Sequence, residues 1–129
     1  MINLYIKERT VGDITVLDLK GRERIAGNAV ALYKSICCLL QEGKTRIILN
    51  VSGVTYIDPI GLGELISSQV SALNKGGEIK LINLTAPLGE LLAAAKLLAV
   101  MDVYENELEA LASFAGQGQS VGQPQLSLV

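Results

Sequence analysis

Apolar runs of two different kinds predict the strands of this protein. Residues 46–51 form a nearly continuous apolar run, which is typical of a strand covered on both faces. Residues 14–20 and 78–84 alternate between apolar and polar positions, so each favours a strand with two unlike faces. The predicted faces are Thr15, Leu17 and Leu19 opposite Ile14 and Val16, and then Ile79 together with Leu81. Residues 4–6 and 100–104 add a first strand and a short last one.

Turn residues and helix caps connect these strands. Val11-Gly12-Asp13 turns the first strand back into the second as a β-hairpin. Capping side chains at Asn28, Asp58, Thr85 and Asn106 open four predicted helices, of which the first is stopped by Gly43. The residues expected to face the core are Leu32, Ile36, Leu39 and Leu40 in the first helix, Leu62, Leu65, Ile66, Gln69 and Leu73 with Val70 at the edge in the second, Leu88, Leu91, Leu92 and Ala95 in the third, and Leu108, Leu111 and Ala112 in the fourth.

The alternation of strands and helices predicts the fold class. It indicates an α/β fold with a mixed sheet of four to five strands, parallel at its centre, and with the hairpin at one edge. At 129 residues the chain is long enough for a single domain with its own core. We expect this domain to span residues 1–115. Residues 116–129 are rich in Gly and Gln without core spacing, and they predict a disordered tail.

The junction between the buried run and the second helix is the most informative stretch. Asp58 supplies a capping side chain and Pro59 suits the first helical position, so the helix begins at Pro59 or Ile60. At about 100° per residue, Ile60 projects away from the core-facing stripe, on the same side as Glu64 and Ser67. The sequence therefore predicts an exposed isoleucine on the first turn of an otherwise polar face.

The composition argues against several classes of partner and compartment. A net charge of −2 and a pI near 5.1 give no electrostatic basis for binding nucleic acid or an anionic membrane surface. The longest apolar candidate, residues 91–101, is interrupted by Lys96 and is shorter than the roughly 20 residues of a membrane span. Since no signal peptide is visible either, we expect a cytoplasmic protein. Adjacent Cys37 and Cys38 cannot join distant segments, and they favour two small hydrophobic residues on a helix over a vicinal disulfide or a soft-metal site.

The residue types required for catalysis are mostly missing. The chain contains no histidine, which removes the commonest general base near neutral pH and the commonest metal ligand. Gly61-Leu62-Gly63 looks like half of a dinucleotide-binding motif, but it lies inside a helix instead of the turn before one. Two glycines within a helix more readily let another backbone come close. We therefore expect no enzyme activity, no cofactor and no metal.

Residues 49–65, Leu-Asn-Val-Ser-Gly-Val-Thr-Tyr-Ile-Asp-Pro-Ile-Gly-Leu-Gly-Glu-Leu, closely resemble the hallmark of STAS domains. This family includes the bacterial anti-sigma factor antagonists, or anti-anti-sigma factors. The resemblance extends over about residues 1–114, through Gly21, residues 75–84 and Val103-Tyr104-Glu105. It implies a small α/β domain that binds an anti-sigma factor, which is a serine kinase with an ATP-binding fold, and thereby frees a sigma factor.

The chain departs from the family pattern where regulation is concerned. In the family the aspartate is followed by two small hydroxyl-bearing residues, and the second is the one that the kinase phosphorylates. Pro59 and Ile60 occupy these places, so the usual phospho-acceptor is missing. Asn50 stands where the family commonly has an acid, and Arg22-Glu23-Arg24 lacks the usual acidic pattern.

These observations predict a partner-binding surface at the helix start that phosphorylation at position 60 cannot regulate. It comprises Asp58, Pro59, Ile60, Gly61, Gly63 and Glu64. Asp58 matches the family's functional aspartate, although capping the helix could be its whole role. Ser52, Thr55 and Ser67 are neighbouring hydroxyls that could replace the acceptor, or could be ordinary solvated residues.

Two further readings of the same surface stay open. STAS-like domains also serve as accessory subunits of membrane transporters, where they brace a transport ATPase without being phosphorylated, and the missing acceptor is compatible with such a scaffold. An exposed Ile60 could equally drive a weak homodimer.

Overall fold

Five strands and four helices make up the part of the chain that the structure describes. This computed structural model describes residues 4–21, 29–54, 57 and 59–119. In chain order the elements are β1 (Leu4–Val11), β2 (Ile14–Gly21), α1 (Ala29–Gln41), β3 (Arg46–Val54), α2 (Pro59–Asn74), β4 (Glu78–Ile82), α3 (Ala86–Ala94), β5 (Asp102–Tyr104) and α4 (Glu107–Gln119).

The strands form one mixed sheet in the order β1-β2-β3-β4-β5. β1 pairs antiparallel with β2 through a tight turn in which Gly12 has a φ of 63°, and the other neighbours are parallel. The predicted fold class, with its parallel centre and its N-terminal hairpin, is confirmed. The register between β2 and β3 shifts at Asp18 and Lys20. Gly53 lies opposite this irregularity, where a Cβ would come within 2.8 Å of the Leu19 carbonyl oxygen, so only glycine fits without a shift.

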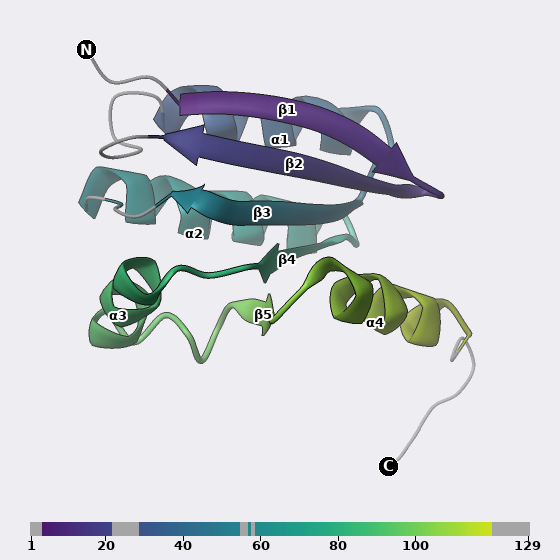
Figure 1. The fold of residues 1–129 in the computed structure, drawn as a ribbon. Coiled ribbons are helices and arrows are strands. Elements are labelled where there is room, and N and C mark those ends of the chain that lie inside the picture. The colour runs from purple at the N-terminus through teal and green to yellow at the C-terminus, as the bar shows by residue number, and fades with distance from the viewer. Residues whose placement is uncertain (1–3, 22–28, 55–56, 58, 120–129) are drawn as a thin grey trace.

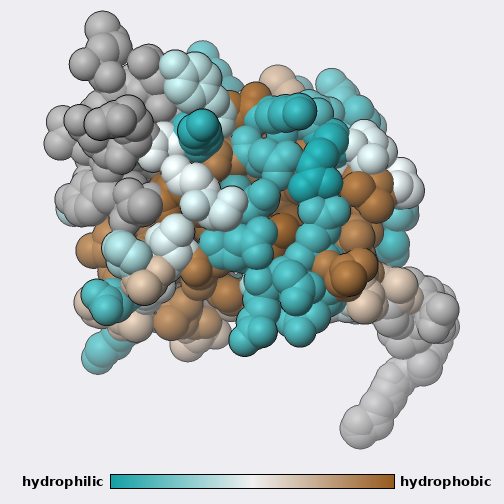
Figure 2. Space-filling view, viewed as in Figure 1, coloured by the Kyte–Doolittle hydropathy of each residue, from teal (hydrophilic) through white to brown (hydrophobic). Residues whose placement is uncertain are grey.

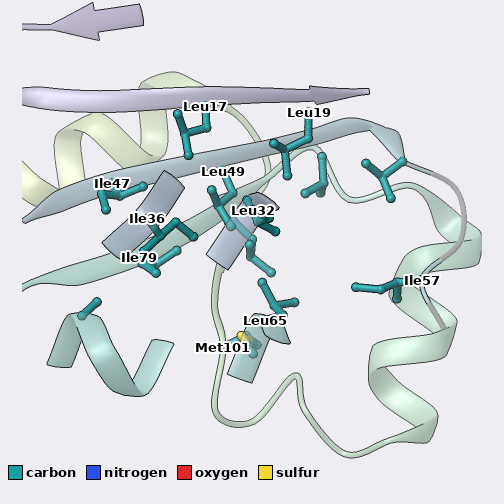
Figure 3. Close-up of a cluster of buried hydrophobic side chains, with 14 of the residues drawn as sticks. Leu17, Leu19, Leu32, Ile36, Ile47, Leu49, Ile57, Leu65, Ile79 and Met101 are labelled. Atoms are coloured by element: carbon teal, nitrogen blue, oxygen red, sulfur yellow. The ribbon is translucent and has the colours of Figure 1, made fainter. Parts of the chain in front are cut away.

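Helices α1 and α2 cover one face of the sheet, which in Figure 1 is the face behind the strands. Leu17, Leu49 and Leu81 project into this core from neighbouring strands, and α1 meets them with Leu32 and Ile36. Figure 3 shows Leu17, Leu49, Leu32 and Ile36 together with Leu65 and Met101. All four core residues predicted for α1 are buried, so its orientation is confirmed.

Helix α4 covers part of the opposite face. Ile14 and Val16 of β2 and Ile48 of β3 pack there against Ala110 and Phe114. The two faces predicted for β2 are therefore confirmed, because Leu17 and Leu19 belong to the first core and Ile14 and Val16 to this one.

Side-chain caps begin the last two helices as predicted. The Leu88 amide donates to Thr85 Oγ1 over 3.3 Å, and the Glu109 amide donates to Asn106 Oδ1 over 2.9 Å. Asn28 and Asp58, the caps predicted for α1 and α2, lie outside the described residues, as does most of the predicted tail.

The predicted core stripe of α2 is confirmed for Leu65 but wrong for Ile66 and Leu73. Gly61, Leu65, Ser68 and Ala72 are buried, at spacings of four, three and four residues. By contrast Ile66 and Leu73, predicted to face the core, are 37% and 58% exposed. Three of the four buried positions are small, so α2 lies close to the sheet and its bulkier side chains are left on the flanks.

Three core predictions for the later helices are also wrong. Ala95 is exposed because α3 ends at Ala94, which makes Ala95 the cap. Leu108 is 78% exposed and Ala112 is exposed, because Ala110 and Phe114 face the sheet and positions two apart lie about 200° around a helix. Leu88 and Leu92 of α3 are buried as predicted.

No helix in the described ranges combines the length and the apolar character needed to cross a membrane.

Candidate functional site

The start of α2 lies at the carboxyl end of the parallel strands, directly after β3 (Figure 1). Ile57 is 2% exposed and belongs to the main core, so it fixes the chain just before the helix begins. Pro59 is the first residue of α2, as predicted, and it is exposed. The sequence therefore anchors this helix end on one side and leaves its tip open to solvent.

The predicted partner-binding residues differ in how far they are accessible. Pro59 and Gly63 are exposed, Glu64 is half-buried and Gly61 is buried. Asp58 and the side chain of Ile60 lie outside the described part of the chain, so the predicted outward direction of Ile60 stays a prediction.

No described residue approaches the open side of Gly63. Among the described residues, a Cβ built at this position would meet no atom within 4 Å beyond its own stretch of helix. Glycine inside a helix costs roughly 1 kcal/mol relative to alanine, and the described residues give no packing reason for a glycine here. The open surface at Gly63 is thus the feature of this site that intramolecular packing leaves unexplained.

The candidate hydroxyls near the site have ordinary surroundings. Ser52 is exposed near the end of β3, and its amide donates to Asn50 Oδ1 over 3.2 Å. Ser67 is exposed on α2, whereas the adjacent Ser68 is buried and donates to the Glu64 carbonyl over 2.9 Å. Thr55 lies outside the described residues.

A polar network on the open part of the sheet joins strands that the sequence analysis treated separately. Arg9 donates to Asp18 and to Glu107 of α4, each over a shortest distance of 2.6 Å. Asn50 donates to Asp18 over 2.8 Å and accepts from Asn83 over 3.1 Å. Figure 2, which faces this side of the molecule, shows a band of hydrophilic residues across it.

The charges of this network are matched, which fits a structural role. The hydrogen bonds from Arg9 hold the pKa of both Asp18 and Glu107 below their usual values. Hydrogen bonds to Glu107 and Asp18 in turn raise the pKa of Arg9. The sequence gives no sign of the role of Arg9, because pairing across 98 residues leaves no local pattern.

Lys80 is a second group that sequence reasoning missed. Its side chain is fully buried and its Nζ lies 2.6 Å from Asp102 and 3.0 Å from Glu78. Burial alone would lower the pKa of Lys80, but the hydrogen bonds to Asp102 and Glu78 outweigh it and raise the pKa. The alternation of apolar and polar residues in β4 indicates that Lys80 faces away from Ile79. The sequence does not show that α4 covers Lys80.

Neither cysteines nor carboxylates gather into a metal site among the described residues. Cys37 and Cys38 are both free; Cys38 is exposed and Cys37 half-buried.

Comparison with known proteins places this arrangement in a family. The family model described as the STAS domain matches residues 5–110, which is most of the chain. The chain belongs to the STAS family.

The sequence of this STAS domain is also similar to that of a bacterial regulator. Over 66 residues it is 31% identical to the anti-sigma F factor antagonist of Paenibacillus polymyxa. The match covers 51% of this chain and 56% of that relative, so the chain spans little more than half of the relative's length. We therefore describe the protein as an anti-sigma factor antagonist-like STAS domain.

Solved structures share the fold at low sequence identity. A STAS domain protein from Planctomyces limnophilus has a TM-score of 0.74 at 17% identity, with 85% of this chain and 97% of that chain covered. An anti-sigma factor antagonist from Mycobacterium paratuberculosis has a TM-score of 0.72 at 16% identity, with coverage of 88% and 93%. The murine anion transporter Slc26a9 contains the same fold, with a TM-score of 0.70 at 18% identity, in 18% of its own chain.

Proposed function

We propose that this STAS domain is an anti-sigma factor antagonist that acts as a protein-binding module. Its partner is an anti-sigma factor, a serine kinase with an ATP-binding fold, which docks on the start of α2 from Asp58 to Gly63 together with Glu64. The sequence similarity to the anti-sigma F factor antagonist of Paenibacillus polymyxa supports the class of partner. The observation that carries the location is the open surface at Gly63.

The environment of Gly63 supports close approach by a partner backbone. Gly63 weakens its own helix, and no described residue packs against it. A partner backbone that can approach only where there is no Cβ would account for this glycine. Pro59 lies one turn earlier and is exposed, so it offers an apolar contact next to the glycine.

The first turn of α2 also supports docking without phosphate control. Residues 59–62 are Pro-Ile-Gly-Leu, which carry no hydroxyl and no charge. A phosphate would add about −1.5 to −2 charge at this helix end, and no side chain in this turn accepts one. We therefore propose that the affinity for the partner is not regulated at position 60.

Substituting Gly63 tests the location, because it separates folding from binding. We expect Gly63→Ala to raise the free energy of unfolding by up to about 1 kcal/mol, since alanine is the better helix former. The same variant should bind the anti-sigma factor encoded in its own genome about tenfold more weakly or worse, because the added methyl group blocks close approach.

Gly89→Ala is the matched control for this experiment. Gly89 lies inside α3 and a Cβ there also meets nothing within 4 Å, so this change should stabilise the fold and leave binding unchanged. Isothermal titration calorimetry gives the affinities and urea unfolding the stabilities. Equal affinity of Gly63→Ala and wild type for the anti-sigma factor would place the docking surface elsewhere, and capture of a transport ATPase instead would favour the scaffold function.

A further inference from the structure

An apolar stripe runs along one flank of α2, and the fold leaves most of it exposed, although Leu62 is half-buried and packs against the main core. The stripe consists of Pro59, Leu62, Ile66, Val70 and Leu73. Ile66, Val70 and Leu73 are 37%, 49% and 58% exposed, and Pro59 is also exposed. The stripe lies beside the buried small residues Gly61, Ser68 and Ala72, and it spans almost the whole length of α2.

The stripe has the spacing of a helix-pairing seam. Pro59, Leu62, Ile66 and Leu73 are separated by three, four and seven residues, which is the heptad pattern that keeps one edge of a helix against a partner helix. Val70 lies one helical turn after Ile66 and adds a further exposed apolar side chain beside this heptad line. A second helix laid along this flank would bury all five side chains.

The charge distribution favours a second copy of this chain as the occupant. The only charged residue in α2 is Glu64, and it lies seven residues from Ser71, so the two share a flank. Ser71 faces α1, because its hydroxyl lies 3.3 Å from the hydroxyl of Tyr33. The stripe therefore offers no charge for an oppositely charged partner to recognise, and two copies meet there without like-charge repulsion.

The order of residues along the stripe is self-complementary. When two α2 helices run antiparallel about a two-fold axis at Ile66, Leu62 lies opposite Val70 of the other copy and Pro59 lies opposite Leu73. Each apolar side chain then meets another, as an isologous interface requires. We propose that α2 pairs with α2 of a second copy through this stripe to form a symmetric dimer. This pairing shares Pro59 and Leu62 with the surface proposed for the anti-sigma factor, so the two complexes compete for the first turn of α2.

Cysteine crosslinking tests the register directly. In a chain carrying Cys37→Ser and Cys38→Ser, we expect Ile66→Cys to form a covalent dimer under mild oxidation, because the two copies of position 66 meet at the axis. Ser67→Cys is the control, since Ser67 is exposed on the same turn but lies off the stripe. Crosslinking no more efficient at position 66 than at position 67 overturns the proposed pairing.

Sedimentation equilibrium tests the energetics without a new thiol. We expect Val70→Glu to raise the dimer dissociation constant at least about tenfold, because pairing would bury a charge. Leu108→Glu is the matched control: Leu108 is the most exposed large apolar residue described and lies on α4, so dimerisation should not change. Circular dichroism checks that both variants stay folded.

Two results would contradict the proposal. One is a wild-type chain that stays monomeric at every concentration, including after residues 120–129 are deleted to exclude their docking on the stripe. The other is a dimer that Val70→Glu leaves intact. Loss of anti-sigma factor binding in Val70→Glu, with a monomeric wild type, would assign the stripe to that partner instead.

Discussion

At the scale of single residues, Lys80 shows how a charged side chain can serve as part of the core. Its Nζ lies 4.6 Å from the centre of the Phe114 ring and 5.0 Å from that of Tyr104, in addition to its two carboxylate partners. The Glu78 and Asp102 side chains are 38% and 43% exposed, but the Glu78 Oε1 that faces Lys80 is itself buried. The aliphatic stem and the rings, more than the charge, fill the space under α4.

Two substitutions at position 80 separate packing from charge. We expect Lys80→Met to lose about 1 to 2 kcal/mol of unfolding free energy, because methionine keeps the apolar packing but leaves the buried Glu78 Oε1 without its ammonium partner. Lys80→Ala should lose at least about 2 kcal/mol more, since it leaves a cavity against Phe114. Urea unfolding measures both. Equal losses in the two variants would show that the ion pairs, and not the packing, stabilise this corner.

At the scale of elements, the sequence predicted the kind and order of each strand and helix but not every orientation. The alternation in β2 and the stripe of α1 were reliable, because each has one set of large apolar residues to bury. In α2 most of the large residues form one line, and the buried line next to it holds small residues together with Leu65. A hydrophobic pattern selects the large ones, whereas close packing on a sheet selects Ser68 and Ala72.

The orientation of α2 can be tested at two adjacent positions. Ala72→Leu should destabilise the fold by about 1 to 3 kcal/mol, because Ala72 is fully buried against the sheet. Leu73→Ala, next to it, should change stability by less than about 1 kcal/mol, because Leu73 is mostly exposed. Thermal unfolding at a concentration that keeps the chain monomeric gives both values. The reverse order would mean that α2 is turned by about one residue from the orientation described here.

The sequence predicted which residue types form the candidate site, but not which of them are buried or exposed. Pro59 at the first helical position and the lack of a hydroxyl there are visible in the sequence. The burial of Gly61 and the open space at Gly63 are not, because two glycines in the same helix turn look alike until the helix is placed on the sheet.

At the scale of the whole molecule, the network around Arg9 links β1, β2 and α4, and through Asn50 it reaches β3 and the end of β4. Asp18 accepts hydrogen bonds from Arg9 and Asn50, whereas Asp13 pairs only with Arg46 at the exposed hairpin turn among the described contacts. We expect Asp18→Asn to cost about 1 to 3 kcal/mol at pH 7, and Asp13→Asn less than about 0.5 kcal/mol.

The stability contributed by this network should depend on pH in one direction. Asp18 and Glu107 have pKa values below their unfolded values, so their contribution is complete above the unfolded pKa values near 4 and is lost as the pH falls through the folded ones. Urea unfolding between pH 7 and pH 2 should therefore show the difference between wild type and Asp18→Asn shrinking below about pH 4. A difference that persists unchanged to pH 2 would assign the cost to packing.

Adding ATP to the complex with the anti-sigma factor tests the central claim most directly. The measurement follows phosphate incorporation and complex dissociation together, for wild type and for Ile60→Ser. This variant puts a hydroxyl at position 60, where the sequence resemblance implies that the family has its phospho-acceptor. We expect the wild-type complex to persist without incorporating phosphate, and the Ile60→Ser complex to become phosphorylated and to dissociate. Release of the wild-type chain with phosphate on Ser52, Thr55 or Ser67 would contradict the account.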